Sequence, residues 1–178
     1  MYKLAATIAI STILTTGLVT SVSAHQGATG IVKERMDQMD VMKKSMKSMA
    51  AMFKGKTAYD ADAVRKHSQT IAKHSATTLT KLFPEGSLQH ASEAKQEIWK
   101  KWDKFEFLST ELKRISLALE TSADIREADN NEASMSMSMD TSAMADPAVT
   151  EDSADSLFRQ LADTCSSCHT SFRKKKNK

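Results

Sequence analysis

Two cysteines and a histidine near the C-terminus carry the clearest chemistry in the sequence, in the run Cys165-Ser166-Ser167-Cys168-His169. Two thiols three positions apart can each form a thioether bond with one vinyl group of the same porphyrin, and the histidine that follows can ligate the iron. The spacing Cys-x-x-Cys-His is typical of covalently attached haem c. The sequence therefore predicts one haem c bound through Cys165 and Cys168, with His169 as an axial ligand.

Other uses of two cysteines fit this chain less well. A thioredoxin-like dithiol belongs to a βαβ pattern, and no part of this chain alternates strands and helices. A zinc site needs about four ligands at suitable spacing, whereas the chain has only two cysteines, and its other histidines are scattered. Ordinary surface, loop or terminal positions are expected for these other histidines: His25, His67, His74 and His90.

Four segments have apolar residues at helical spacing, and none alternates as a strand would. Gly55 suits the end of the first segment, and Asp60 or Asp62 can cap the start of the second. The haem motif lies in the second half of the last segment. We expect an all-α fold, an antiparallel four-helix bundle with the covalent haem near the C-terminal helix, built from helices at residues 29–54, 60–82, 92–121 and 153–174.

The first 24 residues have the features of a secretory signal peptide. Lys3 gives a positive start, an apolar stretch follows, and Val22-Ser23-Ala24 has the small-x-small pattern of a cleavage site. The apolar stretch is short and interrupted for a membrane-spanning helix. We expect cleavage after Ala24, export to the periplasm, no stable membrane span after cleavage, and one mature domain at residues 25–178.

A long link at residues 122–152 is rich in Ser, Met, Ala, Asp and Asn. Links of more than about 12–15 residues are uncommon unless they are functional or disordered, so we expect a flexible surface insertion. Clustered thioethers also suit Cu(I), and this leaves copper handling open as an alternative for the methionines of the link: Met135, Met137, Met139 and Met144.

The charge distribution argues against some partners. The formal net charge is +3, and the basic run at residues 173–178 is typical of a solvated tail. No basic face is interleaved with aromatic residues, so nucleic-acid binding is not expected.

A second ligand for the iron has several candidates on the first expected helix. A thioether is a soft ligand that suits haem iron, although a methionine stripe more often fills a core. The helix carries six methionines: Met36, Met39, Met42, Met46, Met49 and Met52.

Over almost the whole mature chain, the sequence resembles the class II cytochromes c, the cytochrome c′ family of four-helix bundles. The Cys-x-x-Cys-His-x-x-Phe-Arg ending is the most specific part of this resemblance. The other similar segments are Arg35-x-x-x-Met39, Met52-Phe53-Lys54-Gly55, Tyr59-Asp60 and Glu97-Ile98-Trp99.

The resemblance implies roles for four residues. In the low-spin branch of the family a methionine at the Met39 position ligates the iron, which implies His169/Met39 ligation here, with Met36 and Met42 as alternatives if the helix is rotated. In cytochromes c′ proper an apolar residue there shields a five-coordinate iron that can bind nitric oxide or carbon monoxide. The resemblance also implies that Arg35 lies near a haem propionate and that Arg173 lies near the proximal histidine, where its charge would tune the reduction potential of the iron.

The sequence thus favours a periplasmic carrier of single electrons that exchanges them with other periplasmic redox proteins. We do not expect an enzyme, because no acid–base pair or activated nucleophile is visible and a six-coordinate iron has no free position for a substrate. A gas-binding five-coordinate cytochrome and a copper-handling protein are the alternatives. The resemblance also makes a homodimer plausible.

Overall fold

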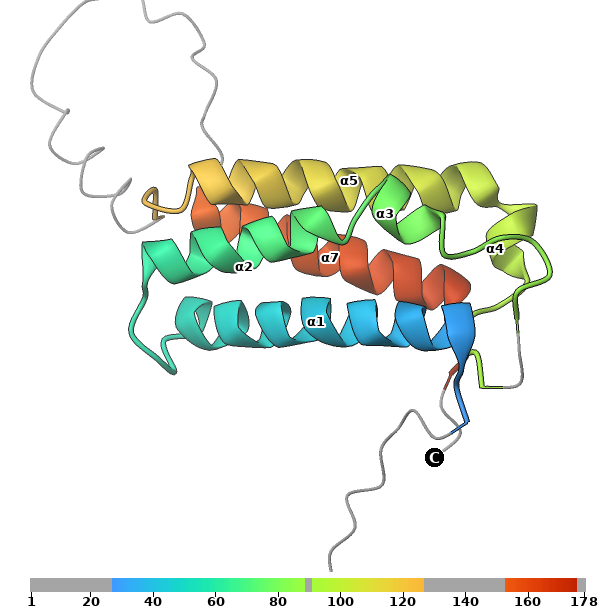
Figure 1. Cartoon of the computed structure of the whole chain (residues 1–178). Helices are drawn as coiled ribbons and strands as arrows, with labels where there is room; N and C mark the ends of the chain where they lie inside the picture. Colours follow the sequence, from blue (N-terminus) through green and yellow to red (C-terminus); the bar gives the residue numbers. More distant parts are fainter. Residues whose placement is uncertain (1–26, 89–90, 127–152, 176–178) are drawn as a thin grey trace, which may run out of the picture.

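Four long helices, each running opposite to the one before it, make up most of the described chain (Figure 1). The computed structural model describes residues 27–88, 91–126 and 153–175. The long helices are α1 (Gly30–Phe53), α2 (Ala61–Lys73), α5 (Trp102–Thr121) and α7 (Ala154–Phe172). Two short helices, α3 (Thr77–Thr80) and α4 (Glu97–Lys100), precede α5. The expected all-α antiparallel bundle is confirmed.

The ends of these helices follow local sequence signals. Asp60 caps α2 by accepting a hydrogen bond from the Ala63 N–H at 3.0 Å, and Ser153 caps α7 in the same way through Ser156. After α1 the chain turns through Gly55, whose φ of +66° is a conformation that glycine adopts without a side-chain penalty. All three positions agree with the expected boundaries.

The second expected helix, residues 60–82, is broken in the structure. α2 ends at Lys73, and the separate helix α3 begins only at Thr77. Between them Ala76 has a φ of +53°. Its N–H donates to the Ser109 carbonyl oxygen at 3.0 Å, and its own carbonyl accepts from the Ser109 hydroxyl at 3.2 Å. A tertiary contact with α5 replaces helical hydrogen bonds here, so local periodicity could not predict the break.

The third expected helix begins later than residue 92. Residues 92–95 pair with the end of α7 instead, through an isolated antiparallel bridge between Ala94 and Arg173. The helical stretch is then divided at Lys101, whose φ and ψ of −131° and 45° lie outside the helical region. The expectation of one continuous helix over 92–121 was therefore wrong at its first turns.

The core has two parts along the bundle. The first lies among α1, α2, α5 and α7 and includes Val64, Leu119 and Leu161, all fully buried. The second is largely aromatic and lies near α3, α4 and the C-terminal end of α7, with Phe83, Phe105 and Phe172. These rings meet edge to face, Phe105 lying 4.9 Å from Phe83 and 5.5 Å from Phe172 between centroids.

The first residues of the expected link, Ser122–Arg126, are fixed against the bundle. The Ala154 N–H donates to the Ile125 carbonyl oxygen at 2.8 Å, and Arg126 forms a two-pronged ion pair with Asp155 at 2.7 and 2.9 Å. The chain therefore leaves α5 and enters α7 at neighbouring points. The remainder of the link, with its four methionines, lies outside the described residues.

The ends of the chain are described only in part. The expected signal peptide lies outside the described residues. Within the described ranges, no helix combines the length and the apolar character that crossing a bilayer requires.

Candidate functional site

The two thiols of the sequence motif lie on the inner side of the last turns of α7. Residues three apart on a helix share a face, and Cys165 and Cys168 are both partly buried and not joined in a disulfide. Burial raises the pKa of each thiol to about 11. Both sulfur atoms are therefore protonated at neutral pH and lie beside each other on one wall of a cavity.

His169 adjoins the same cavity. Burial lowers the pKa of its imidazole; the neighbouring Arg173 lowers it further, and Glu93 acts in the opposite direction. A neutral imidazole is the form that ligates metals. Among the described residues, no group of three or more His, Cys, Asp or Glu side chains could hold a metal ion. His169 is thus suited to supply a single ligand to a metal whose other ligands come from elsewhere, such as a porphyrin.

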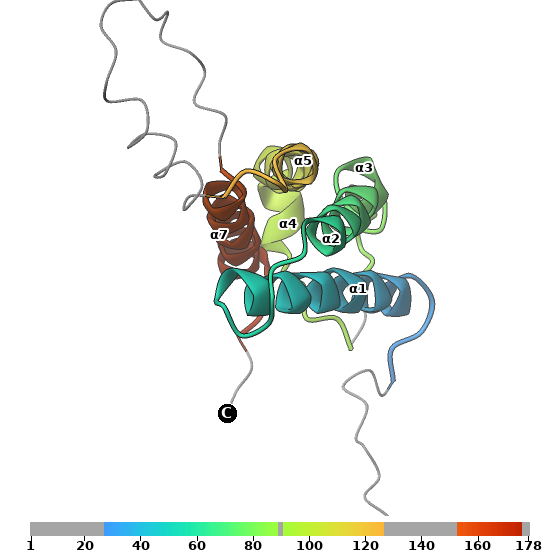
Figure 2. The ribbon, with the colours of Figure 1, turned by 90° about the vertical axis from the view of Figure 1, so that its left-hand side faces the viewer.

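The cavity has a volume of about 890 Å³, which lies in the range of small-molecule and cofactor sites. It lies between α7 and α1, and α5 contributes side chains such as Phe105 to its wall. Viewed from the end of the bundle, α5 and α7 are seen nearly along their axes while α1 crosses below them (Figure 2). On α1 the lining side chains are Val32, Arg35, Met36, Met39, Asp40, Met42, Lys43 and Met46.

Met39 lies in this wall on α1, opposite the haem motif. Its side chain is partly buried and packs against both parts of the core. Met36 and Met42 line the cavity as well, so the three methionines considered as ligands all border one space. Met49 and Met52 instead belong to the buried core, as expected for a methionine stripe that fills a core.

Arg35 is a buried cation at the edge of the cavity, with 4% of its surface exposed. Its Nε donates to the Leu82 carbonyl oxygen at 2.5 Å, and its other nitrogens donate to the Ser87 carbonyl oxygen at 3.1 Å and to the Ser87 hydroxyl. The guanidinium also lies 4.3 Å from the centre of the Phe83 ring. Burial lowers the pKa of Arg35, and in the described structure its hydrogen-bond partners are neutral oxygen atoms.

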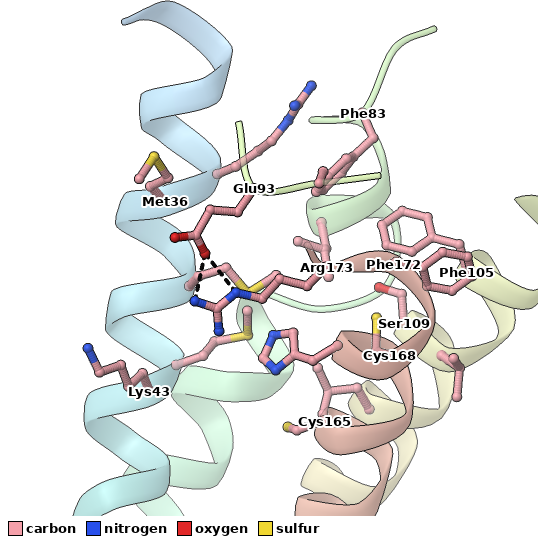
Figure 3. A pocket seen from close by; sticks show the side chains of 18 of the residues that line it. Met36, Lys43, Phe83, Glu93, Phe105, Ser109, Cys165, Cys168, Phe172 and Arg173 are labelled. Atoms are coloured by element: carbon pink, nitrogen blue, oxygen red, sulfur yellow. Dashed lines mark hydrogen bonds and ion pairs between the residues drawn. The ribbon is translucent and has the colours of Figure 1, made fainter. Parts of the chain in front are cut away.

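Arg173 has a charged partner, Glu93, which the sequence did not suggest. The Glu93 carboxylate accepts a hydrogen bond from Nε of Arg173 at 2.7 Å and forms an ion pair with Nη2 at 2.6 Å. Both side chains line the cavity, and Figure 3 shows the pair beside the motif cysteines. No local pattern marks Glu93, because its role depends on the pairing of its segment with the end of α7.

Two other histidines are described, His67 and His74, and both lie away from the cavity. The His67 imidazole lies 3.4 Å from the Ser45 hydroxyl, and the Nδ1 atom of His74 is buried without a hydrogen-bond partner. Neither residue lines the cavity. His25 and His90 lie outside the described residues.

Comparisons with known proteins agree with this geometry. The sequence model of the family described as Cytochrome C′ matches residues 30–141, which is more than half of the chain but ends before the Cys-x-x-Cys-His motif. No curated protein is similar enough in sequence to count as a match.

Several solved structures have the same fold and cover more of the chain than the family model does. The cytochrome c′ from Rhodopseudomonas palustris is 25% identical, with a TM-score of 0.62, over 84% of this chain and 100% of that one. A cytochrome c prime from Shewanella frigidimarina is 19% identical, with a TM-score of 0.62, over 82% of this chain and 94% of that one. The same coverage, with 22% identity and a TM-score of 0.60, is found for a nitric oxide complex of a mutant cytochrome c prime from Alcaligenes xylosoxidans.

Proposed function

This chain belongs to the cytochrome c′ family, and from that premise we propose that its cavity holds one haem c. The observation that carries the proposal is that two neighbouring thiols and a neutral imidazole border one cavity of about 890 Å³. The sulfur atoms of Cys165 and Cys168 would each bond to a vinyl carbon, with the thiol hydrogen passing to the other carbon of that vinyl group. His169 would ligate the iron from the α7 side.

The mass of the denatured protein tests this attachment. We expect the wild-type chain to carry the mass of one haem after unfolding, because thioether bonds survive denaturation. The Cys165→Ser/Cys168→Ser variant should carry none, since His169 alone cannot hold haem in an unfolded chain. A wild-type chain without covalent haem would contradict the proposal.

We further propose that the iron binds a small diatomic gas, nitric oxide or carbon monoxide, on its α1 side. Haem supplies the ligand-binding iron, and the chain supplies the surroundings of that face. Two observations support this proposal. One solved structure of a family member is described as a nitric oxide complex. In addition, methionine, valine and phenylalanine side chains surround the cavity. Such a wall favours a neutral, sparingly polar ligand over water.

One-electron transfer with Met39 as a second iron ligand is the other candidate function. The observation that favours it is the position of Met39, whose thioether borders the cavity on the wall opposite His169. A bond from this sulfur would occupy the position that a gas needs. It would also favour electron transfer, since an iron with both axial ligands in place changes little between oxidation states.

The ferric absorption spectrum of Met39→Leu distinguishes the two candidates. If the iron is five-coordinate, the wild-type spectrum is high-spin and the substitution, which conserves size and apolar character, leaves it unchanged. If Met39 is a ligand, the wild-type spectrum is low-spin and the substitution converts it to high-spin. Met46→Leu, which alters another methionine of the same wall, is the matched control.

Arg35 is proposed to bind a haem propionate. A buried cation without a counter-ion is costly, and Arg35 has only neutral hydrogen-bond partners in the described structure. A propionate would supply the missing negative charge at the edge of the cavity.

The location and assembly of the protein are proposed on the same basis. The signal-like residues 1–24 and membership of the family support export to the periplasm, with residues 25–178 as one mature domain. A homodimer and exchange of electrons with periplasmic redox proteins are compatible with this proposal. Binding or carrying, rather than turnover of a substrate, would be the role of the protein.

A further inference from the structure

The segment just before α4, residues 92–95, is hydrogen-bonded to the C-terminal turn of α7, which carries His169. Backbone hydrogen bonds join Lys95 N–H to the Phe172 carbonyl oxygen at 2.8 Å and Lys174 N–H to the Glu93 carbonyl oxygen at 2.7 Å. The Lys95 ammonium group also donates to the Thr170 carbonyl oxygen at 3.2 Å. The backbone of Glu93 is thus held at a fixed place beside the proximal end of the cavity.

This placement brings a carboxylate to the Arg173 guanidinium. Arg173 directly follows α7, and its N–H donates to the His169 carbonyl oxygen at 3.0 Å, so the two residues are neighbours. Glu93 Oε2 accepts a hydrogen bond from Arg173 Nε at 2.7 Å and lies 2.6 Å from Nη2 of the same guanidinium, and the two contacts hold the opposite charges together (Figure 3). Glu93 and Arg173 both border the cavity that His169 borders.

The cations around the cavity differ in whether a carboxylate balances their charge. Lys43 lies 3.6 Å from Asp40, and Arg173 is paired with Glu93. Arg35 donates only to neutral oxygen atoms in the described structure. A propionate entering the cavity meets an uncompensated charge at Arg35, whereas the Arg173 charge is already matched.

We propose that Glu93 is the counter-ion of Arg173 at the proximal side of the haem, and that it keeps the reduction potential of the iron low. This inference rests on the proposed haem site. An unmatched positive charge near the iron favours the ferrous state over the ferric state, because the ferrous state carries one positive charge less. The adjacent carboxylate cancels much of that field. Glu93 acts through Arg173 and is a positioning residue.

Redox titration of the holoprotein tests the proposal with four variants. Glu93→Gln keeps the size of the side chain and an oxygen acceptor but removes the charge, so the midpoint potential should rise. Arg173→Gln should lower it, and the double variant should return close to the wild-type value. The matched control is Glu97→Gln, which removes the same charge from an exposed residue at the start of α4 that does not border the cavity; its shift should be much smaller.

The ionic strength should be low during these titrations, because the side chains of Arg173 and Glu93 are 41% and 38% exposed and salt screens such charges. Equal shifts in Glu93→Gln and Glu97→Gln, or shifts of the same sign in Glu93→Gln and Arg173→Gln, would overturn the inference. If Glu93 only fastened its segment to α7, Glu93→Gln would lower the melting temperature without moving the potential, and this also contradicts it. The intact mass of each variant reports haem attachment separately: a wild-type chain without haem would refute the proposed function and this inference together.

Discussion

Arg35 shows how one buried charge ties the cavity to the rest of the fold. It begins on α1 and reaches Leu82 and Ser87, on the chain that follows α3, with three hydrogen bonds. Hydrogen bonds from charged groups contribute more than those between neutral groups, about 1.5–3 kcal/mol each. The residue therefore has a structural role whether or not a propionate binds to it.

Replacing Arg35 should measure that role. We expect Arg35→Gln to lower the free energy of unfolding of the holoprotein by about 2 kcal/mol or more in urea denaturation. Lys33→Gln is the control, since Lys33 pairs with Asp37 on the exposed face of the same helix and exposed pairs contribute about 0–1 kcal/mol. Equal losses in the two variants would show that the buried hydrogen bonds of Arg35 contribute nothing specific.

The two thiols give a pH dependence in the haem-free chain. Burial raises the pKa of Cys165 and Cys168 from 9.0 to about 11, so the reactive thiolate is scarce below that pH. At pH 8 alkylation by iodoacetamide should be about 100-fold slower than for an ordinary thiol, since each pKa unit changes the thiolate fraction tenfold. The rate should rise until about pH 11. Alkylation at the rate of a free cysteine would mean that the cavity wall is not formed before haem attachment.

Site residues could be predicted from the sequence alone only where they lie close together in the chain. Cys165, Cys168 and His169 are adjacent in the chain, and their motif predicted them together. Arg173 and Met39 required a family resemblance. Glu93 had no signal, because its partner is 80 residues away and is reached through a backbone pairing that no periodicity encodes.

The helices were predictable to within a few residues where caps and glycine define their ends. Two of the three departures from the expected helices, at Ala76 and at Ser92–Lys95, are places where the backbone bonds to another element instead of to itself. The third is the division at Lys101. Helical periodicity indicates which face of a segment is apolar. It cannot indicate where backbone hydrogen bonds go to another element instead of within the helix. The pairing at Ser92–Lys95 sets the position of Glu93, on which the proposed control of the reduction potential rests.

The connection between α5 and α7 supports a prediction about a whole segment. Ile125 and Ala154 are joined by a backbone hydrogen bond, and Arg126 pairs with Asp155, so the two ends of the link are already neighbours. Deleting residues 127–152 and joining the ends with a short Gly-Ser link should preserve the helical circular dichroism and the haem spectrum.

A variant in which Gly and Ser replace those residues at unchanged length is the matched control for this deletion. If the shortened chain lost its haem while the control kept it, the two ends would not lie together as described.

At the scale of the molecule, α1 and α7 form opposite walls of one cavity. Close packing joins α1 to α2, α2 to α5 and α5 to α7, so the first and last helices are each held by a neighbour while the space between them is left for a cofactor. The His169 wall and the Met39 wall thus come from the two ends of the chain. The sequence alone was enough to predict the bundle and its cofactor. It was not enough to predict whether the iron has a ligand on the α1 side, because a methionine there can either pack in the wall or ligate the iron.

Carbon monoxide binding by the reduced holoprotein tests the central claim most directly. The ferrous protein is titrated with carbon monoxide while its visible absorption spectrum is recorded. An iron left open on the α1 side predicts a high-spin ferrous spectrum that changes fully on stoichiometric addition of the gas. A low-spin ferrous spectrum that carbon monoxide leaves unchanged would contradict gas binding and would assign the α1 side of the iron to Met39.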